Sequence, residues 1–248
     1  MGPRSTGTSG IFVTGTGTEV GKTVVAAAIA HALATEGKRV AVFKPAVTGL
    51  GELTAGGPKG STAGDLSAHR QSNAGDHELL RLAAGSKQSD EEIAPYRYGP
   101  AMSPHLAAAR AGETIDPERL LAGARAAADG ADALVCEGVG GLLVPLASGY
   151  LVRDFAAALG LPLAIVASPG LGTINHTLLT IEAARSAGLE IQAVVLTPWP
   201  EEPGAIEESN LATIAALGYA EVETLPRLDL AKPDTWPTPG DLPALCGG

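Results

Sequence analysis

The chain of 248 residues carries 27 acidic residues against 17 lysines and arginines, and its net charge of −10 disfavours nucleic acid or an anionic membrane surface as a partner. A hydrophobic content of 45% with 18% charged residues is typical of a globular domain with a substantial core. The apolar runs fall well short of the roughly 20 residues of a membrane-spanning helix. Two cysteines exclude a disulfide framework and five histidines lack paired zinc-ligand spacing, so we expect a cytoplasmic protein without structural zinc.

Short β-rich apolar runs alternate with helical patterns along the whole chain. Strands are predicted at residues 11–14, 40–43, 133–136, 163–167, 191–196 and 222–225, and helices at about 22–35, 76–84, 105–111, 117–128, 174–187 and 205–217. Most of the strands are uniformly apolar, as in a parallel sheet covered on both faces. The alternation predicts a single α/β domain with a doubly wound, mostly parallel sheet flanked by helices, whose ligands bind at the carboxyl ends of the strands.

The two ends and one internal segment depart from this alternation. Residues 1–10 are small and polar and predict a flexible leader, so the α/β domain is expected to span residues 11–228. Residues 229–248 hold four prolines and are predicted to form a poorly ordered tail. Residues 49–75 form a long loop rich in Gly, Ser, Thr and Ala, and such loops are usually functional or mobile.

A glycine-rich segment from Gly15 to Thr23 lies between the first predicted strand and the first predicted helix. Backbone N–H groups in such a loop form a concavity for phosphate oxygens, with the positive end of the next helix behind them. Lys22 is expected to reach the β- and γ-phosphates, and the Thr23 hydroxyl to bind Mg²⁺. The spacing is imperfect, since Thr16 stands where glycine is usual. The flanking strand and helix nevertheless predict a phosphate-loop NTPase fold that binds a nucleoside triphosphate.

Two other strand ends carry charged residues, and these are expected to face the same ligand-binding edge of the sheet as the glycine-rich segment. Lys44 follows residues 40–43, and a second ammonium beside a phosphate loop can neutralise charge on a transferred phosphoryl group, although a solvated lysine is the commoner reading in isolation. Glu137 follows residues 133–136 in the position of a Walker-B carboxylate, which holds Mg²⁺. The alternative is a strand-terminating acid before a glycine turn. The turn at Gly170 and Gly172 is a weaker anion-site candidate, because helix caps look the same.

These segments together resemble the dethiobiotin synthetase family. The resemblance lies in G-T-x-T-E-V-G-K-T, K-P-x-x-[ST]-G, E-G-x-G-G and L-G-x-x-N-H, with further likeness at Pro95-Tyr96 and Ser103-Pro104-His105, and it runs from about residue 11 to residue 228. It implies an ATP-dependent cyclo-ligase of biotin synthesis. The substrates would be 7,8-diaminononanoate, CO₂ (or bicarbonate) and MgATP, with closure of a cyclic urea through a carbamic–phosphoric anhydride and release of ADP and phosphate. The resemblance also implies a homodimer.

The resemblance assigns roles to individual residues. The catalytic residues would be Lys22, Lys44 and Thr16. The metal ligands would be Thr23, Glu137 and an aspartate, for which Asp76 fits better than Asp65 because it lies at the right distance before Pro95-Tyr96. The implied substrate-binding residues are Thr48, Gly172, Thr173 and Asn175, with the Gly172–Asn175 segment contributed by the partner subunit. The implied nucleotide-binding residues are Glu19, Val20, Gly21, Lys22, Thr23, Val24, Glu137, Gly138, Val139, Gly140, Thr197, Pro226, Arg227 and Leu228.

One departure from the family concerns the residue that would contact the nucleobase. The family commonly has an asparagine that hydrogen-bonds adenine where this chain has Thr197, so we expect ATP or another nucleoside triphosphate to serve as the substrate.

Two other classes of ATP-using protein are alternatives. Partition-type ATPases share the fold but place an additional lysine at the start of the loop, where this chain has Gly15 and Thr16. Cobyrinate-type amidoligases add a glutaminase domain, and Cys136 and Cys246 lack its context. The synthetase therefore leads.

Overall fold

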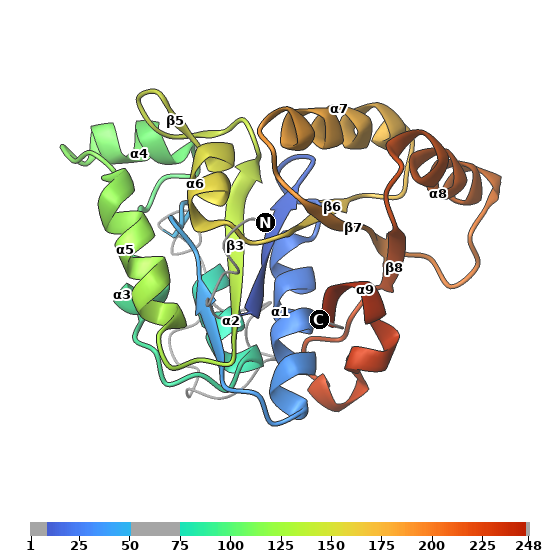
Figure 1. The fold of residues 1–248 in the computed structure, drawn as a ribbon, viewed down its shortest axis with the longest axis horizontal. Helices are drawn as coiled ribbons and strands as arrows, with labels where there is room; N and C mark the ends of the chain where they lie inside the picture. The colour runs from blue at the N-terminus through green and yellow to red at the C-terminus, as the bar shows by residue number, and fades with distance from the viewer. Residues whose placement is uncertain (1–8, 51–74, 247–248) are drawn as a thin grey trace, which may run out of the picture.

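A six-stranded sheet forms the centre of the protein, of which the computed structural model describes residues 9–50 and 75–246. The strand order is β2-β3-β1-β6-β7-β8, and every neighbouring pair is parallel. The strands are β1 (Ser9–Gly15), β2 (Val40–Phe43), β3 (Ala133–Gly141), β6 (Leu163–Ala167), β7 (Ile191–Trp199) and β8 (Val222–Pro226). Their carboxyl ends therefore meet along one edge of the sheet, as predicted (Figure 1).

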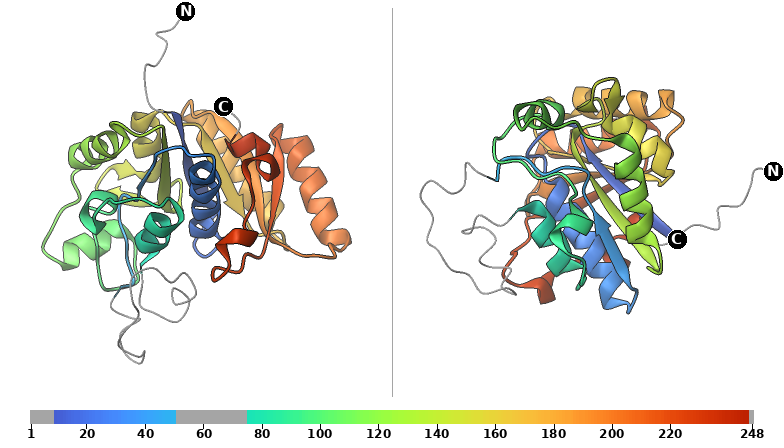
Figure 2. Two further views of the ribbon diagram at one scale, coloured as in Figure 1. Left: turned by 90° about the horizontal axis from the view of Figure 1, so that it is seen from below. Right: turned by 90° about the vertical axis from the view of Figure 1, so that its left-hand side faces the viewer.

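Helices cover both faces of the sheet, which confirms the doubly wound fold (Figures 1 and 2). Side chains alternate along β1, so that Ile11 and Val13 enter one core cluster and Phe12 enters the other. The first cluster is covered by α1 (Lys22–Thr35), α2 (Asp76–Ala83) and α3 (Asp90–Ile93). The second is covered by α4 (Pro104–Arg110), α5 (Pro117–Ala128), α6 (Val152–Leu159), α7 (Thr173–Ser186) and α8 (Ala205–Gly218). No helix in the described ranges combines the length and hydropathy needed to span a bilayer.

Most predicted elements lie within one or two residues of their observed positions. Strands β3 and β7 run further than predicted, to Gly141 and Trp199, so the glycines after Glu137 still belong to the sheet. The sequence reading missed α3, α6 and the hairpin of β4 (Pro145–Ala147) and β5 (Tyr150–Leu151).

The carboxyl-terminal segment is ordered and packs on α1. It forms η3 (Pro233–Thr235), η4 (Pro239–Asp241) and α9 (Pro243–Cys246). Trp236 and Leu242 are 5% and 2% exposed and belong to the core cluster beneath α1. The prediction of a poorly ordered tail was therefore wrong for residues 229–246, because apolar side chains spaced between the prolines find an apolar surface on α1. The predicted leader up to residue 8 and most of the loop at 49–75 lie outside the described residues.

The outer edge of the sheet at β2 is closed by a side chain. Val42 donates its N–H to Gln88 Oε1 at 2.9 Å, and Gln88 Nε2 donates back to the Val42 carbonyl at 3.0 Å. Lys44, which follows β2, donates its backbone N–H to the Ile93 carbonyl at 2.8 Å. These bonds fix the carboxyl end of β2 and therefore the backbone from which the Lys44 side chain extends.

Candidate active site

The loop between β1 and α1 turns through a left-handed glycine. Gly21 has φ 98° and stands immediately before α1, a conformation that glycine adopts without strain. A Cβ at Gly21 would lie 2.8 Å from Thr197 Cγ2, so the loop packs closely on the end of β7. The first N–H groups of α1 have no partner within the helix, and its dipole is positive here. The loop therefore presents donors suited to phosphate.

Two buried lysines lie beside this loop. Lys22 is 8% exposed, and its Nζ donates to the Gly17 carbonyl at 2.8 Å. Lys44 is 3% exposed, and its Nζ donates to Asp76 Oδ2 at 2.7 Å and to Glu137 Oε1 at 2.6 Å. The end of β2, the start of α2 and the middle of β3 thus converge on one ammonium group.

Glu137 is fully buried, and only one of its two carboxylate oxygens has a hydrogen-bond partner among the described residues. Its Oε1 accepts hydrogen bonds from Thr23 Oγ1 at 2.9 Å and from Lys44 Nζ at 2.6 Å. Its Oε2 has no hydrogen-bond partner among the residues that the structure describes. A buried carboxylate oxygen left without a partner is costly, and carboxylate and hydroxyl oxygens are the ligands that Mg²⁺ prefers. The donor set of Thr23, Asp76 and Glu137 therefore fits a hard divalent cation.

The two lysines differ in their electrostatic surroundings. Burial lowers the pKa of Lys22, and the charge of Glu137 opposes this only in part. Burial acts in the same direction on Lys44, but the carboxylates of Glu137 and Asp76 outweigh it and raise the pKa of this lysine. Lys44 is therefore held as a cation by two carboxylates, whereas Lys22 has a carbonyl as its hydrogen-bond partner.

Both lysines open into one cavity of about 690 Å³, which we call the lysine cavity. Its wall comes from the β1–α1 loop, from the chain after β2, from the start of α2, from the start of α4 and from the end of β3. The residues are Thr18, Glu19, Gly21, Lys22, Thr23, Val24, Lys44, Ala46, Thr48, Asp76, Ala101, Met102, Ser103, Pro104, Glu137, Val139, Gly140 and Val144. The lysine cavity is thus large enough for a polyphosphate and a small substrate.

A second cavity of about 670 Å³, which we call the proline cavity, adjoins the first. Glu19, Gly21 and Val24 line both cavities, so the two are continuous around the start of α1. The rest of its wall is formed by the end of β7, by the end of β8 and by the chain that follows β8: Thr197, Pro198, Pro226, Arg227, Leu228, Asp229, Leu230 and Ala231. A ligand with a phosphate end and a flat, partly apolar end can therefore span the two.

The sequence is similar to known proteins over most of its length. A family model described as an AAA domain matches residues 9–232. The ATP-dependent dethiobiotin synthetase of Anaeromyxobacter dehalogenans (strain 2CP-1 / ATCC BAA-258) is 40% identical over 212 residues, which cover 86% of each chain. That of Rhodococcus jostii (strain RHA1) is 42% identical over 214 residues, covering 86% of this chain and 83% of the relative. The chain belongs to the dethiobiotin synthetase family.

Solved structures of other families share the fold at low sequence identity. The crystal structure of a ParA family ATPase from Chlorobium tepidum TLS aligns with 96% of this chain and 90% of its own, with a TM-score of 0.52 and 14% identity. At this identity the likeness extends to the fold alone. It agrees with the phosphate-loop NTPase architecture predicted from the sequence.

Most residues that the dethiobiotin synthetase resemblance implied line one of the two cavities. Eleven of them line the lysine cavity: Glu19, Gly21, Lys22, Thr23, Val24, Lys44, Thr48, Asp76, Glu137, Val139 and Gly140. Four others line the proline cavity: Thr197, Pro226, Arg227 and Leu228. The structure brings Asp76 to Lys44, a contact that the sequence did not predict, while Asp65 lies outside the described residues.

Six implied residues line neither cavity. Thr16 and Val20 are only partly buried in the loop, and Gly138 is buried in β3, where a Cβ would meet Phe12 at 3.1 Å. The segment at the start of α7 (Gly172, Thr173 and Asn175) also lies outside both cavities, with the Asn175 side chain exposed.

The sequence reading missed two parts of the walls. Ala101 and Met102 line the lysine cavity beside Ser103-Pro104, a segment that resembles the family but for which the sequence predicts no role. Leu230 and Ala231 line the proline cavity and belong to the segment that was predicted to be poorly ordered. A pattern of apolar residues between prolines was the signal available for that segment.

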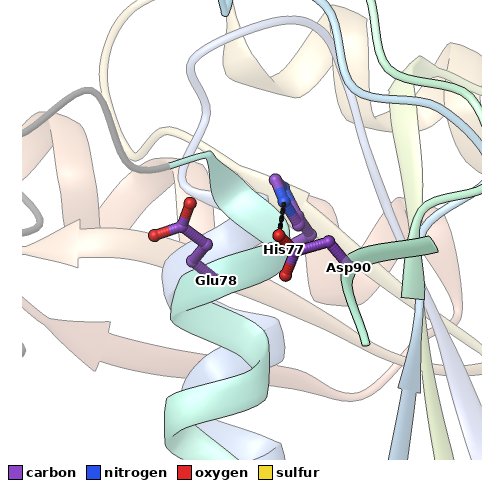
Figure 3. A group of neighbouring side chains, drawn as sticks. All are labelled: His77, Glu78 and Asp90. Atoms are coloured by element: carbon purple, nitrogen blue, oxygen red, sulfur yellow. Dashed lines mark ion pairs between the residues drawn. The ribbon is translucent and has the colours of Figure 1, made fainter. Parts of the chain in front are cut away.

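A cluster of ionisable residues lies next to the site. His77 and Glu78 of α2 and Asp90 of α3 offer ligand atoms within 4.8 Å of one another. Figure 3 shows His77 turned toward Asp90, whose Oδ2 lies 3.8 Å from the imidazole Nε2. The other Asp90 oxygen accepts from Arg81 at 2.9 Å, and burial lowers the pKa of His77. The contacts of Arg81 and His77 with Asp90 join α2 to α3. They therefore help to fix the position of α2, the helix that begins with Asp76.

Proposed function

We propose that the protein is an ATP-dependent dethiobiotin synthetase that converts 7,8-diaminononanoate and CO₂ into dethiobiotin, with release of ADP and phosphate. The observation that carries the proposal is the convergence of Lys22, Lys44 and Glu137 on one cavity, in a chain 40% identical to a curated enzyme of this activity. The adjoining proline cavity supplies room for the nucleoside of a triphosphate.

The reaction has three steps, and the diamine, CO₂ and ATP supply every atom of the products. One amine of the diamine attacks CO₂, forms an N–C bond and loses a proton to give a carbamate. A carbamate oxygen then attacks the γ-phosphorus, and the bond to the β–γ bridging oxygen breaks to release ADP. The second amine attacks the carbon of this carbamic–phosphoric anhydride and loses a proton, the C–O bond breaks so that phosphate leaves and takes up that proton, and the ureido ring closes.

The side chains contribute position and charge, which phosphoryl transfer needs more than covalent help. Lys22, in the phosphate loop, stabilises the negative oxygens of the β- and γ-phosphates. Lys44, fixed by Asp76 and Glu137, stabilises charge on the carbamate oxygen and on the transferred phosphoryl group. Thr48, which lines the same cavity, donates a hydroxyl hydrogen bond beside them, a role that Thr16 does not share because it lines neither cavity.

We further propose Mg²⁺ as the metal of this site. Thr23, Asp76 and Glu137 would hold it, since all three line the lysine cavity and the buried Glu137 Oε2 has no hydrogen-bond partner among the described residues. When bound, the ion supplies additional positive charge beside the phosphates.

We also propose a cytoplasmic homodimer whose active site includes the partner's α7. Asn175 is exposed outside both cavities, so a second subunit is the route by which an α7 residue reaches the diamine. Leu171, just before this helix, is 95% exposed and Leu179, on it, is 60% exposed, which suits an apolar interface.

The activity is tested by incubating the protein with diaminononanoate, bicarbonate and MgATP and measuring dethiobiotin by mass spectrometry. We expect dethiobiotin and phosphate in equal amounts, and neither product with the Lys44→Met variant. Phosphate release that does not require the diamine, with no dethiobiotin formed, would contradict the proposal.

A further inference from the structure

One wall of the proline cavity is formed by a stretch of chain without regular structure, Asp229–Ala231. Such a wall can position a nucleoside only if something else fixes its backbone. The Asp229 carbonyl accepts the backbone N–H of Lys232 at 3.0 Å, and the Ala231 N–H bonds to Asp229 Oδ1 at 3.0 Å. Both bonds are internal to the stretch, so they shape it without attaching it to the domain.

Leu230 packs against the core cluster beneath α1, and Trp236 adds the hydrogen bond that fixes the Asp229 backbone. Its indole Nε1 donates to the Asp229 carbonyl at 2.9 Å, across seven residues. Its ring packs edge-on against His31, with ring centroids 5.3 Å apart and planes at 68°. The side chain is 5% exposed, so both contacts are shielded from water.

His31 belongs to α1, the helix that begins with Lys22 and also contributes Val24 to the proline cavity. Trp236 therefore connects a wall of this cavity to the helix that carries the phosphate-loop lysine. The spacing between the wall and α1 sets the width available to a nucleoside whose phosphates lie on the loop.

We propose that Trp236 is a positioning residue for the nucleotide, which holds the Asp229–Ala231 wall at a fixed distance from α1. This inference rests on the proposed nucleotide-dependent function. It predicts that loss of the indole N–H weakens nucleotide binding while the chemistry of the diamine is preserved.

The test compares Trp236→Phe with Leu242→Val. The first keeps an aromatic ring against His31 and removes the N–H donor. The second trims another buried residue of the same segment, whose side chain cannot hydrogen-bond. For Trp236→Phe we expect Kd and KM for MgATP to rise about two- to tenfold, the range of one net hydrogen bond, with kcat and KM for diaminononanoate unchanged. For Leu242→Val we expect a lower melting temperature and an unchanged Kd. His31→Leu, which removes the ring contact alone, is expected to raise the same Kd and provides a second variant if Trp236→Phe does not fold.

An unchanged Kd in both Trp236→Phe and His31→Leu would overturn the inference, as would an equal rise in Leu242→Val. Calorimetry of MgATP binding separates this from the proposed activity. A wild-type protein that binds MgATP without forming dethiobiotin would refute the activity and leave Trp236 to be judged by Kd alone. A wild-type protein that binds no MgATP would overturn the inference itself.

Discussion

Lys22 and Lys44 have different partners, and this difference predicts separate roles. Lys22→Ala should abolish turnover and weaken nucleotide binding, since the loop loses the ammonium nearest the phosphates. Lys44→Ala should abolish turnover while sparing nucleotide affinity, because its charge acts mainly in the transition state. Each change is expected to cost about 3 kcal/mol or more in transition-state stabilisation. Calorimetry with MgATP and single-turnover rates measure the two effects. Equal losses of nucleotide affinity in both variants would contradict the division.

The surroundings of Lys44 also predict an effect on stability. Lys44→Met leaves the buried Glu137 without its cation, and breaking a buried pair costs about 3–5 kcal/mol. Burial raises the pKa of Glu137 in the folded protein, so an unpaired Glu137 binds a proton more tightly when folded than when unfolded. Folding is then favoured as the pH falls toward the unfolded value of about 4.3, and the deficit against wild type should be smaller at pH 5 than at pH 8.

Urea midpoints at the two pH values measure this deficit. Adding Glu137→Gln to Lys44→Met serves as the control, because it removes the titrating group and should remove most of the difference between the pH values. A deficit that grows as the pH falls would contradict the assignment.

Two aspartates were candidates for the third metal ligand. Asp76 Oδ2 lies 2.7 Å from Lys44 Nζ, which itself contacts Glu137. We therefore expect Asp76→Asn to raise the Mg²⁺ concentration needed for half-maximal activity at least tenfold, about 1.4 kcal/mol, and Asp65→Asn to change it little. Titrating Mg²⁺ against turnover for the two variants decides the question, and the reverse ranking would transfer the role to Asp65.

At the scale of elements, the end of β7 predicts how the base is selected. Thr197 is 3% exposed and carries a single hydroxyl, and Pro198 has no N–H to offer. A wall without a side-chain amide leaves few polar groups unpaired when a different base binds, so discrimination is weak. We expect CTP, GTP and UTP to bind within roughly tenfold of ATP, a gap of about 1.4 kcal/mol. Displacement titrations with the four triphosphates measure this. A preference of several hundredfold for ATP would mean that the backbone selects the base.

The same elements show what could be predicted from the sequence. The six strands of the sheet could be located because uniformly apolar runs are typical of buried parallel strands, and the cluster of Lys22, Lys44 and Glu137 followed because parallel strands end at one edge. The hairpin β4–β5 and helix α6 were missed, since short elements carry little periodicity. The order of the tail was missed because it depends on contacts with α1, far away in the sequence.

At the scale of the whole molecule, the tail is expected to contribute to stability. A variant ending at Lys232 exposes the α1 surface that Trp236, Leu242 and Leu245 cover. Each such side chain contributes about 1.5–3 kcal/mol when fully buried, so the loss should reach several kcal/mol. A fall in the urea midpoint measures it, with a variant that lacks residues 1–8 as the control for end trimming. An unchanged midpoint would mean that the segment after Lys232 does not contribute to the stability of the protein.

The amide of Gln88 has a consequence for how copies of the protein meet. A sheet edge with free N–H and C=O groups accepts a strand from another molecule, which leads to domain swapping and fibrils. At β2, Gln88 occupies both hydrogen-bonding groups of Val42, in the place that an incoming strand would take. Extension of the sheet from one molecule to the next is therefore blocked at this position. Protection of the β2 edge against an added strand therefore involves a glutamine that lines neither cavity.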